Sequence, residues 1–273
     1  MMIVGIDGGN NEVDVASSLG LDHFVSQIGE FRERKMKDIH GKDDMVFEYQ
    51  GRRGFAGTLA LAESEFSGSI MGDSKAHEDA KLRILIALHR QCMMENEFKI
   101  VVGQPISKHT DEEKNRIKNM LIGSHDLIIN GKRKIFTIQA VEVAAEGGAA
   151  FWAKPKDGLV RIIDVGSGTV NCASLRDKRY IDKDSFTLPF GMNTVKTNNL
   201  SEMSRGIVTQ TSKKWNKEDF VWVLGGAAEI LIPYIQKYYP NAMVMHPIFQ
   251  ALEAHPVFAN SIGFYKIGTA IYG

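Results

Sequence analysis

Two stretches, IVGIDGGNNEVDVA (residues 3–16) and RIIDVGSGTVNCAS (residues 161–174), decide the fold because they repeat one pattern. In each, an apolar run ends in an aspartate, a short glycine-rich turn follows, and a second run begins at once. The aspartates, Asp7 and Asp164, are 157 positions apart. A single Asp-Gly turn is weak evidence, since hairpins use it often, but repetition at domain spacing indicates an internal duplication. The sequence therefore predicts a two-lobed α/β protein.

The two turns suit the phosphates of a nucleoside triphosphate. Glycine and small residues at a hairpin tip allow backbone N–H groups to point into the turn with no Cβ in the way. Two such tips facing each other would hold the β- and γ-phosphates from both sides. The aspartate before each tip would repel bare phosphate, so hydrated Mg²⁺ is its expected partner. The alternative is two ordinary hairpins with solvent-facing aspartates.

A third element follows the second hairpin. The stretch VWVLGGAAEILIPYI (residues 221–235) predicts a strand that runs into Gly225 and Gly226 and then into a helix. Two glycines at this point allow the close approach of a flat ring or a ribose. This pattern is common in α/β proteins, and its order after the second phosphate turn gives it weight.

The composition limits the classes of function. Of 273 residues, 44% are hydrophobic and 24% are charged, and 33 basic residues balance 33 acidic ones. These ordinary values predict a globular protein with no direct sequence-specific binding to nucleic acid and no attraction to a membrane. Cys92 and Cys172 are expected to be buried free thiols. Because no secretory leader and no long apolar run occurs, we expect a cytoplasmic protein.

Periodicity places the remaining elements. Strands are predicted at 3–6, 13–17, 23–28, 45–49, 53–56, 99–105, 220–226 and 242–245, with a hairpin over 125–143 that turns on Asn130-Gly131. Helices are predicted at 76–94, 110–121, 200–215 and 227–238, after Pro256, and from the small residues of AAEGGAAFW (144–152). The charged run 31–44 is expected to be a solvated loop, with a partner contact as the alternative.

Together these elements resemble the actin/Hsp70/sugar-kinase ATPase superfamily. Residues 3–15 resemble its phosphate-1 loop, 162–171 its phosphate-2 loop, 223–228 its adenosine motif, and 101–105 with 141–150 its connect-1 region. The closing stretch ANSIGFYKIG (259–268) is similar to the connect-2 helix of plasmid-segregation actins such as ParM, AlfA and the wider Alp group.

The resemblance implies a reduced actin-like fold of duplicated ribonuclease H-like lobes. Lobe I would comprise residues 1–147 plus 256–273, and lobe II residues 148–255. Only 60 residues separate Asp164 from Gly225, which leaves little room for the extra subdomain IIB that actin and ParM insert there.

The resemblance also assigns roles to individual residues. Asp7 and Asp164 would hold Mg²⁺ through water, and Asp164 would help to place the nucleophilic water. The first phosphate tip would be Gly8, Gly9, Asn10 and Asn11, the second Gly166, Ser167, Gly168 and Thr169, and the adenosine contact Gly225, Gly226 and Ala227. Glu146 is the expected catalytic group that orients water, with Glu142 as second choice and a helix N-terminal carboxylate as the structural alternative for Glu146.

One position departs from the family pattern. The phosphate-contacting lysine expected seven residues after the first aspartate is Asp14 here. A carboxylate facing phosphate is repulsive unless Mg²⁺ or a remote lysine compensates. The departure places the hydrolysis rate and the phosphate contacts of the first lobe in question, and nucleotide binding less so.

The function implied by the resemblance is a slow ATPase that polymerises on binding ATP. Filaments would segregate plasmid DNA through a DNA-binding adaptor protein, and hydrolysis would drive disassembly. Protomers would contact head to tail, and Phe24, Phe31, Met36, Met45 and Phe47 are either core residues or candidates for that surface. The alternatives are a small-metabolite kinase similar to type III pantothenate kinases, and a nucleotide-binding module without hydrolysis. An Hsp70-like chaperone is disfavoured because no substrate domain follows residue 273.

Overall fold

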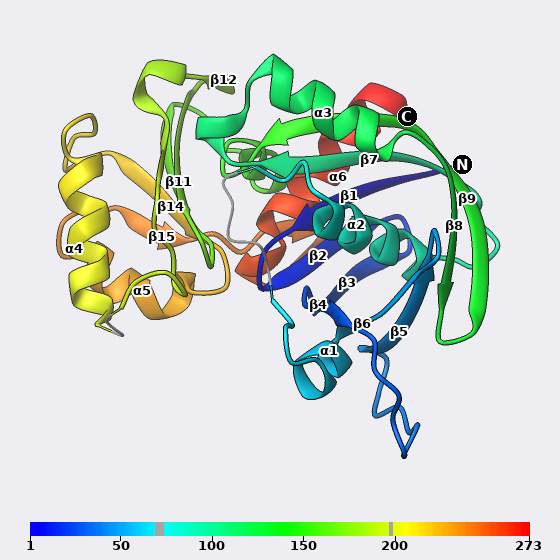
Figure 1. Cartoon of the computed structure of the whole chain (residues 1–273). Helices are drawn as coiled ribbons and strands as arrows, with labels where there is room; N and C mark the ends of the chain where they lie inside the picture. Colours follow the sequence, from blue (N-terminus) through cyan, green and yellow to red (C-terminus); the bar gives the residue numbers. More distant parts are fainter. Residues whose placement is uncertain (69–73, 197–198) are drawn as a thin grey trace.

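The computed structural model describes residues 1–68, 74–196 and 199–273, which form two large β-sheets and one two-stranded sheet (Figure 1). The first sheet contains β1 (Met2–Gly8), β2 (Glu12–Ser17), β3 (Gly20–Val25), β4 (Ile28–Glu30), β5 (Asp44–Tyr49), β6 (Arg52–Gly57), β7 (Glu97–Gln104), β8 (Gly123–Ile129) and β9 (Lys132–Ala145). The second contains β10 (Leu159–Val165), β11 (Val170–Arg176), β12 (Arg179–Tyr180), β13 (Phe186–Leu188), β14 (Phe220–Leu224) and β15 (Ala242–Val244), and the small one β16 (Ile248–Phe249) and β17 (Leu252–Glu253).

Helices cover both large sheets. The α-helices are α1 (Thr58–Glu63), α2 (Glu78–Arg90), α3 (Asp111–Leu121), α4 (Leu200–Thr211), α5 (Ala228–Ile235) and α6 (Ala259–Tyr272). Short 3-10 helices span Ile106–Lys108, Ala149–Ala153, Asp182–Asp184 and Pro256–Phe258. In Figure 1, α4 and α5 lie beside the second sheet, and α6 begins where the two lobes meet and runs along the first sheet. In the described part of the chain, no helix combines the length and apolar character needed to span a bilayer.

The two large sheets repeat one strand order, as the internal duplication predicts. The order β3-β2-β1-β7-β9 in the first corresponds to β12-β11-β10-β14-β15 in the second. In both, the opening hairpin is antiparallel and its first strand pairs in parallel with a later one. The register also corresponds, because Asp7 lies opposite Asp14 and Asp164 lies opposite Asn171.

Helix α6 packs closely against the strand that carries Asp7. Val4 and Ile6 point into the core of the first lobe, so the intervening Gly5 faces the opposite side of the sheet. A Cβ at Gly5 would lie 2.2 Å from the carbonyl oxygen of Ser261 in α6, which only glycine avoids. Gly263 likewise lies against the backbone of Ala149, between the sheets. The small residues of α6 therefore bring its first turn to the ends of both hairpins.

The segment between the second hairpin and the adenosine motif stays on the second sheet. Its strands β11, β12 and β13 are paired in that sheet. Helix α4 packs against the sheet through Met203 and Ile207. Across the described residues 165–196 and 199–224, no separate lobe is inserted. The two-lobed α/β fold that the duplicated hairpins predict is thus present without an insertion in this described segment.

Three expectations from the sequence need correction. The predicted helix over 144–152 is instead the end of β9, a turn at Gly147 with φ of 72°, and a 3-10 helix from Ala149. The predicted strand 23–28 ends at Val25, because the chain leaves β2 after this point and Ile28 instead pairs with Ala56 of β6, as the start of β4. Helices α2 and α4 end at Arg90 and Thr211, earlier than expected.

The candidate surface residues divide clearly. Phe24, Met45 and Phe47 are buried in the core of the first lobe, whereas Phe31 is half-buried and Met36 is 76% exposed. Cys172 is a buried free thiol and Cys92 a half-buried one. Of the five apolar candidates, Met36 is the one that the structure presents fully at the surface.

Candidate functional site

The two glycine-rich hairpins meet at one cleft between the lobes. Two adjoining cavities of about 210 Å³ and 330 Å³ occupy it. Both are lined by Asp7, Gly9, Asp164, Gly166, Ser167 and Asn260. Because they share these residues, the cavities form one cleft, whose size suits a small ligand.

Most residues predicted for the site lie at this cleft. The cavities are lined by Asp7, Gly9, Asn10, Asn11, Glu146, Asp164, Gly166, Ser167, Gly168, Thr169, Gly225, Gly226 and Ala227. Gly8 is the exception among the predicted ligand contacts, because it lies within β1 and lines neither cavity. Glu142, the second choice for the water-orienting group, lies in β9 and pairs with Lys118 at 3.0 Å, away from both cavities.

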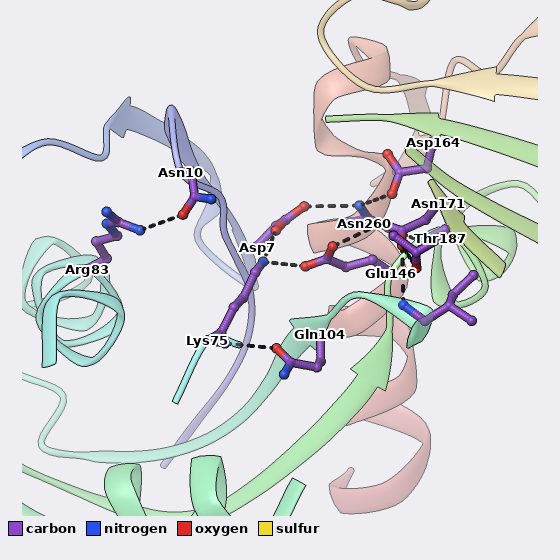
Figure 2. A network of polar contacts seen from close by, with 12 residues as sticks. Asp7, Asn10, Lys75, Arg83, Gln104, Glu146, Asp164, Asn171, Thr187 and Asn260 are labelled. Atoms are coloured by element: carbon purple, nitrogen blue, oxygen red, sulfur yellow. Dashed lines mark hydrogen bonds and ion pairs between the residues drawn. The ribbon is translucent and has the colours of Figure 1, made fainter. Parts of the chain in front are cut away.

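The hairpin tips approach each other across the cleft. Asn10 Nδ2 lies 3.5 Å from where a Cβ of Gly168 would be. Asn193 Nδ2 donates to Asn11 Oδ1 at 3.3 Å, which joins the second lobe to the first tip. Behind the first tip, the buried Arg83 donates to Asn10 Oδ1 at 3.2 Å (Figure 2). These contacts fix the first tip from both sides.

Asn260, at the start of α6, joins the two aspartates. Its Nδ2 donates to Asp7 Oδ2 and to Asp164 Oδ2, at 3.0 Å in each case (Figure 2). Its Oδ1 accepts a hydrogen bond from Gly147 N–H at 3.0 Å. One side chain therefore contacts both hairpins and the turn that carries Glu146.

Lys75 brings a positive charge between two of the acids. Its Nζ contacts Asp7 Oδ1 at 3.3 Å and forms an ion pair with Glu146 Oε1 (Figure 2). Its backbone N–H donates to Gln104 Oε1 at 3.3 Å, which places it at the end of β7. Burial opposes this charge, but the carboxylates of Glu146 and Asp7 outweigh it and raise the pKa of Lys75.

Glu146 is held in place at both carboxylate oxygens. Its Oε2 accepts from Asn171 Nδ2 at 3.1 Å, and its backbone N–H donates to Gln104 O at 3.0 Å. Asn171 Oδ1 in turn accepts from Thr187 Oγ1 at 2.8 Å, which fixes the amide orientation. The turn after β9 thus points a buried carboxylate into the cleft.

Burial shifts the pKa of the acids in the cleft. It raises the pKa of Asp164 to about 8, with the neighbouring charges of Glu146 and Asp7 as further causes. Burial also raises the pKa of Glu146, against the opposing effect of Lys75. Carboxylates with raised pKa values in a shared cleft are typical of sites that bind cations or move protons.

Asp14 lines the larger of the two cavities, but its carboxylate is paired with a histidine. It is buried, and its Oδ1 lies 2.6 Å from His23 Nδ1. Burial raises the pKa of Asp14 to about 7, while its own hydrogen bond to His23 and that of Glu12 raise the pKa of His23 to about 10. His23 therefore stays protonated and supplies the positive charge that Asp14 requires.

The acids fit Mg²⁺ through water better than by direct coordination. In the described residues, no group of three or more His, Cys, Asp or Glu could itself hold a metal ion. Mg²⁺ keeps several waters and takes one or two carboxylates plus the phosphates of a substrate. Asp7 and Asp164, gathered on one amide nitrogen, supply the oxygen ligands that such an ion takes.

Comparison with known proteins identifies the family. Residues 5–148 match the family described as actin-like proteins, N-terminal domain. The chain belongs to the actin-like proteins. No curated protein matches its sequence at a significant level.

Solved structures show the same fold along the whole of this actin-like protein. The AlfA filament from Bacillus subtilis plasmid pLS32 is 18% identical, with all of both chains covered and a TM-score of 0.78. The archaeal actin homologue Ta0583 is 17% identical, with 99% of this chain and 100% of that chain covered and a TM-score of 0.79. The apo ParM of pSK41 is 17% identical, with 99% and 97% covered and a TM-score of 0.73. The predicted actin-like fold is confirmed.

Sequence reasoning missed three residues at the cleft of this actin-like protein. Asn260 lies inside the stretch 259–268, and the resemblance of that stretch to connect-2 was the signal that the sequence offered. Asn171 was placed in the second hairpin without a role. Lys75 has no motif around it, and its contacts with Asp7 and Glu146 span 68 and 71 positions.

Proposed function

We propose that this protein is an actin-like ATPase that binds Mg²⁺-ATP in the cleft and polymerises into filaments that segregate plasmid DNA. The observation that carries the proposal is the convergence of Asp7 and Asp164, from two duplicated hairpins, on one nitrogen of Asn260. Family membership and the filament structures among its structural neighbours support it. One of these is described as an AlfA filament bound to AMPPNP.

The nucleotide would lie across both cavities. The tips at 9–11 and 166–169 would hold the phosphates through backbone N–H groups. The adenosine would lie at Gly225, Gly226 and Ala227, before α5. Gly225 has a φ of 92°, and a Cβ there would lie 2.4 Å from Val165 O, so only glycine fits. A Cβ at Gly226 would meet nothing nearer than 3.9 Å, which leaves the surface open to a flat group.

Magnesium, when bound, would neutralise the charge of the phosphates between the two hairpins. Asp7 and Asp164 would hold it through water. Asn260 would keep both carboxylates turned toward the same point. Asp164 lies close enough to Glu146 for their charges to interact, and it would also orient the attacking water.

Glu146 is the group proposed to activate that water. Asn171 holds one of its oxygens and Lys75 the other, so the carboxylate has a fixed direction. A carboxylate held at a water molecule can orient it for in-line attack and accept its proton. The raised pKa of Glu146 brings its basicity closer to neutral pH.

Lys75 is proposed to contact the phosphates in place of the lysine missing at position 14. Among the described residues that line the two cavities, it is the single lysine or arginine, while the acidic ones are Asp7, Glu12, Asp14, Glu146 and Asp164. A triphosphate needs positive charge to enter such a cleft. Asp14 with His23 does not supply it at the tip, so Lys75 is the available group.

Polymerisation would use a head-to-tail contact between protomers, because heterologous contacts that do not close give filaments. The lobes would be residues 1–147 plus 256–273 and residues 148–255, and would move with nucleotide state. A DNA-binding adaptor would connect the filament to the plasmid, since the balanced charge of the chain gives no general attraction to DNA. Hydrolysis would then time disassembly.

The test combines light scattering, negative-stain images and phosphate release with ATP and Mg²⁺. Filaments with ATP, absent without nucleotide, together with slow phosphate release, are the expected result. ATP consumption only when a small metabolite is added, with no filaments, would instead establish a kinase. Filaments or nucleotide binding without phosphate release would establish a module that has lost hydrolysis.

A further inference from the structure

The side chain of Asn260, in the first turn of α6, forms its hydrogen bonds with groups outside this helix. It is 5% exposed, and its side chain makes three hydrogen bonds to the cleft rather than to its own helix. The partners come from β1, from β10 and from the turn after β9. The connection is thus between both lobes and the turn that presents Glu146 (Figure 2).

The chemistry of the partners fixes the orientation of the amide. Gly147 N–H can only donate, so it selects the oxygen of Asn260. The nitrogen then faces Asp7 and Asp164, which accept as carboxylates. Each carboxylate oxygen lies 3.0 Å from the same nitrogen, so the two oxygens are separated by no more than twice that distance. Without this donor pair, two carboxylates so near each other would repel.

We propose that Asn260 is a positioning residue that sets the spacing of Asp7 and Asp164 for a single hydrated Mg²⁺ and links that spacing to the Glu146 turn. The inference rests on the proposed function, because it concerns the same cleft. It predicts that Asn260 matters for the metal-dependent part of nucleotide binding and little for the rest. A residue that only stabilised α6 would affect both parts alike.

The neighbouring Ser261 offers a matched control. It is also buried in the first turn of α6, and its hydroxyl donates locally, to Phe258 O three residues earlier, at 3.1 Å. Ser261→Ala therefore removes a buried polar group from the same turn without touching either aspartate. Both variants are compared in the full-length protein, with thermal unfolding as a check on folding.

The experiment measures the affinity for a fluorescent ATP analogue in Mg²⁺ and in EDTA. For Asn260→Ala, we expect affinity in Mg²⁺ to fall by about ten- to a hundred-fold, as for other residues that orient metal ligands, with little change in EDTA. The Mg²⁺ concentration needed for half-maximal binding should rise by a similar factor. Ser261→Ala should match the wild type in both buffers.

Three outcomes would count against the proposal. An equal loss of affinity in Mg²⁺ and EDTA would overturn it, as would a wild-type Mg²⁺ requirement in Asn260→Ala. If the wild type itself does not bind the nucleotide, the proposed function is overturned, and this inference with it. If Asn260→Ala does not fold, Asn260→Ser, which keeps a small polar group, provides the same comparison between the two buffers.

Discussion

The two glycine-rich hairpins have the same backbone arrangement and differ in the hydrogen bonds that their side chains make. Each has an aspartate at its first strand end and a side chain directly opposite seven residues later, Asp14 in the first and Asn171 in the second. Asn171 donates to Glu146 and so takes part in the cleft. Asp14 is instead buried against His23. The geometry of the two turns is thus the same, whereas the residues opposite the aspartates, Asp14 and Asn171, have different partners.

The comparison explains where positive charge enters the cleft. The second hairpin orients the carboxylate proposed for catalysis, and the first supplies an aspartate proposed to hold Mg²⁺ through water, but no lysine. Lys75 comes from a segment between the hairpins. It contacts both the aspartate of the first hairpin, Asp7, and the glutamate that the second hairpin orients, Glu146. A group from a third element thereby compensates for what the first hairpin lacks.

The largest expected effect concerns the acid that the second hairpin orients. Glu146→Gln keeps the size and the hydrogen bond from Asn171 but cannot accept a proton from water. We expect ATP hydrolysis to fall by about 10²–10⁴-fold with nucleotide binding retained. Phosphate release and analogue binding measure the two effects. Glu142→Gln is the matched control, since Glu142 also lies in the region after β7 but pairs with Lys118; an equal loss in that variant would reject the assignment.

The next effect concerns the charge that the first hairpin lacks. Lys75→Ala removes the lysine between Asp7 and Glu146, and we expect nucleotide affinity to fall by about ten- to a hundred-fold, the range for a hydrogen bond to a charged group. Isothermal titration with an ATP analogue measures it. Lys118→Ala, which removes another lysine paired with a glutamate, should bind normally, and Lys75→Arg should retain more affinity than Lys75→Ala. Unchanged affinity in Lys75→Ala would show that the phosphates are bound without it.

The sequence was sufficient for those parts of the fold that local pattern determines. An aspartate, a glycine turn and a renewed apolar run were visible twice, and both hairpins form as predicted. Thr110 also caps α3 by accepting from Glu113 N–H, as its spacing from Glu113 indicates. The helix predicted over 144–152 was wrong. Alanine favours a helix, but Gly147 takes a φ of 72° that interrupts it, and Gly263 of α6 packs against the backbone of Ala149.

The cleft contacts could not be predicted in the same way. Asn260 reaches Asp7 across 253 positions, and nothing in the local sequence of either residue encodes that approach. The contact depends on the small residues of α6, which allow the helix to lie against Gly5. Sequence reasoning therefore found the ends of the duplicated strands but not the side chains that connect them.

Exchanging the opposite residues tests whether the two hairpins really differ in this way. Asn171→Asp places a second carboxylate where an amide now donates to Glu146, and we expect hydrolysis to fall by about tenfold or more, since one pKa unit of interaction is about 1.4 kcal/mol. Asp14→Asn changes the residue paired with His23, and we expect hydrolysis to change by less than about threefold, because the carboxylate of Asp14 is held by His23, whereas Glu146 is held by Asn171. Phosphate release under saturating ATP measures both. Equal losses would show that the two positions do the same work.

The smallest expected effect concerns the pair that occupies the first hairpin, and it has a definite sign with pH. Asp14 and Glu12 raise the pKa of His23 from 6.5 to about 10 in the folded protein. The folded state therefore binds the proton more tightly than the unfolded one, so the stability from His23 is fully present below pH 6.5 and is lost as pH rises toward 10. Because the His23 side chain is 38% exposed, solvent screening limits the effect to about 1 kcal/mol.

The measurement compares the free energy of unfolding of the wild type and His23→Gln across this pH range. The difference between them should be constant at pH 5–6 and should shrink between about pH 7 and 10. Using the difference removes the titration of groups that do not interact with His23. A difference that grows with pH would mean that His23 is uncharged in the folded protein. The first hairpin would then hold no ion pair to set against the hydrogen bond between Asn171 and Glu146 in the second.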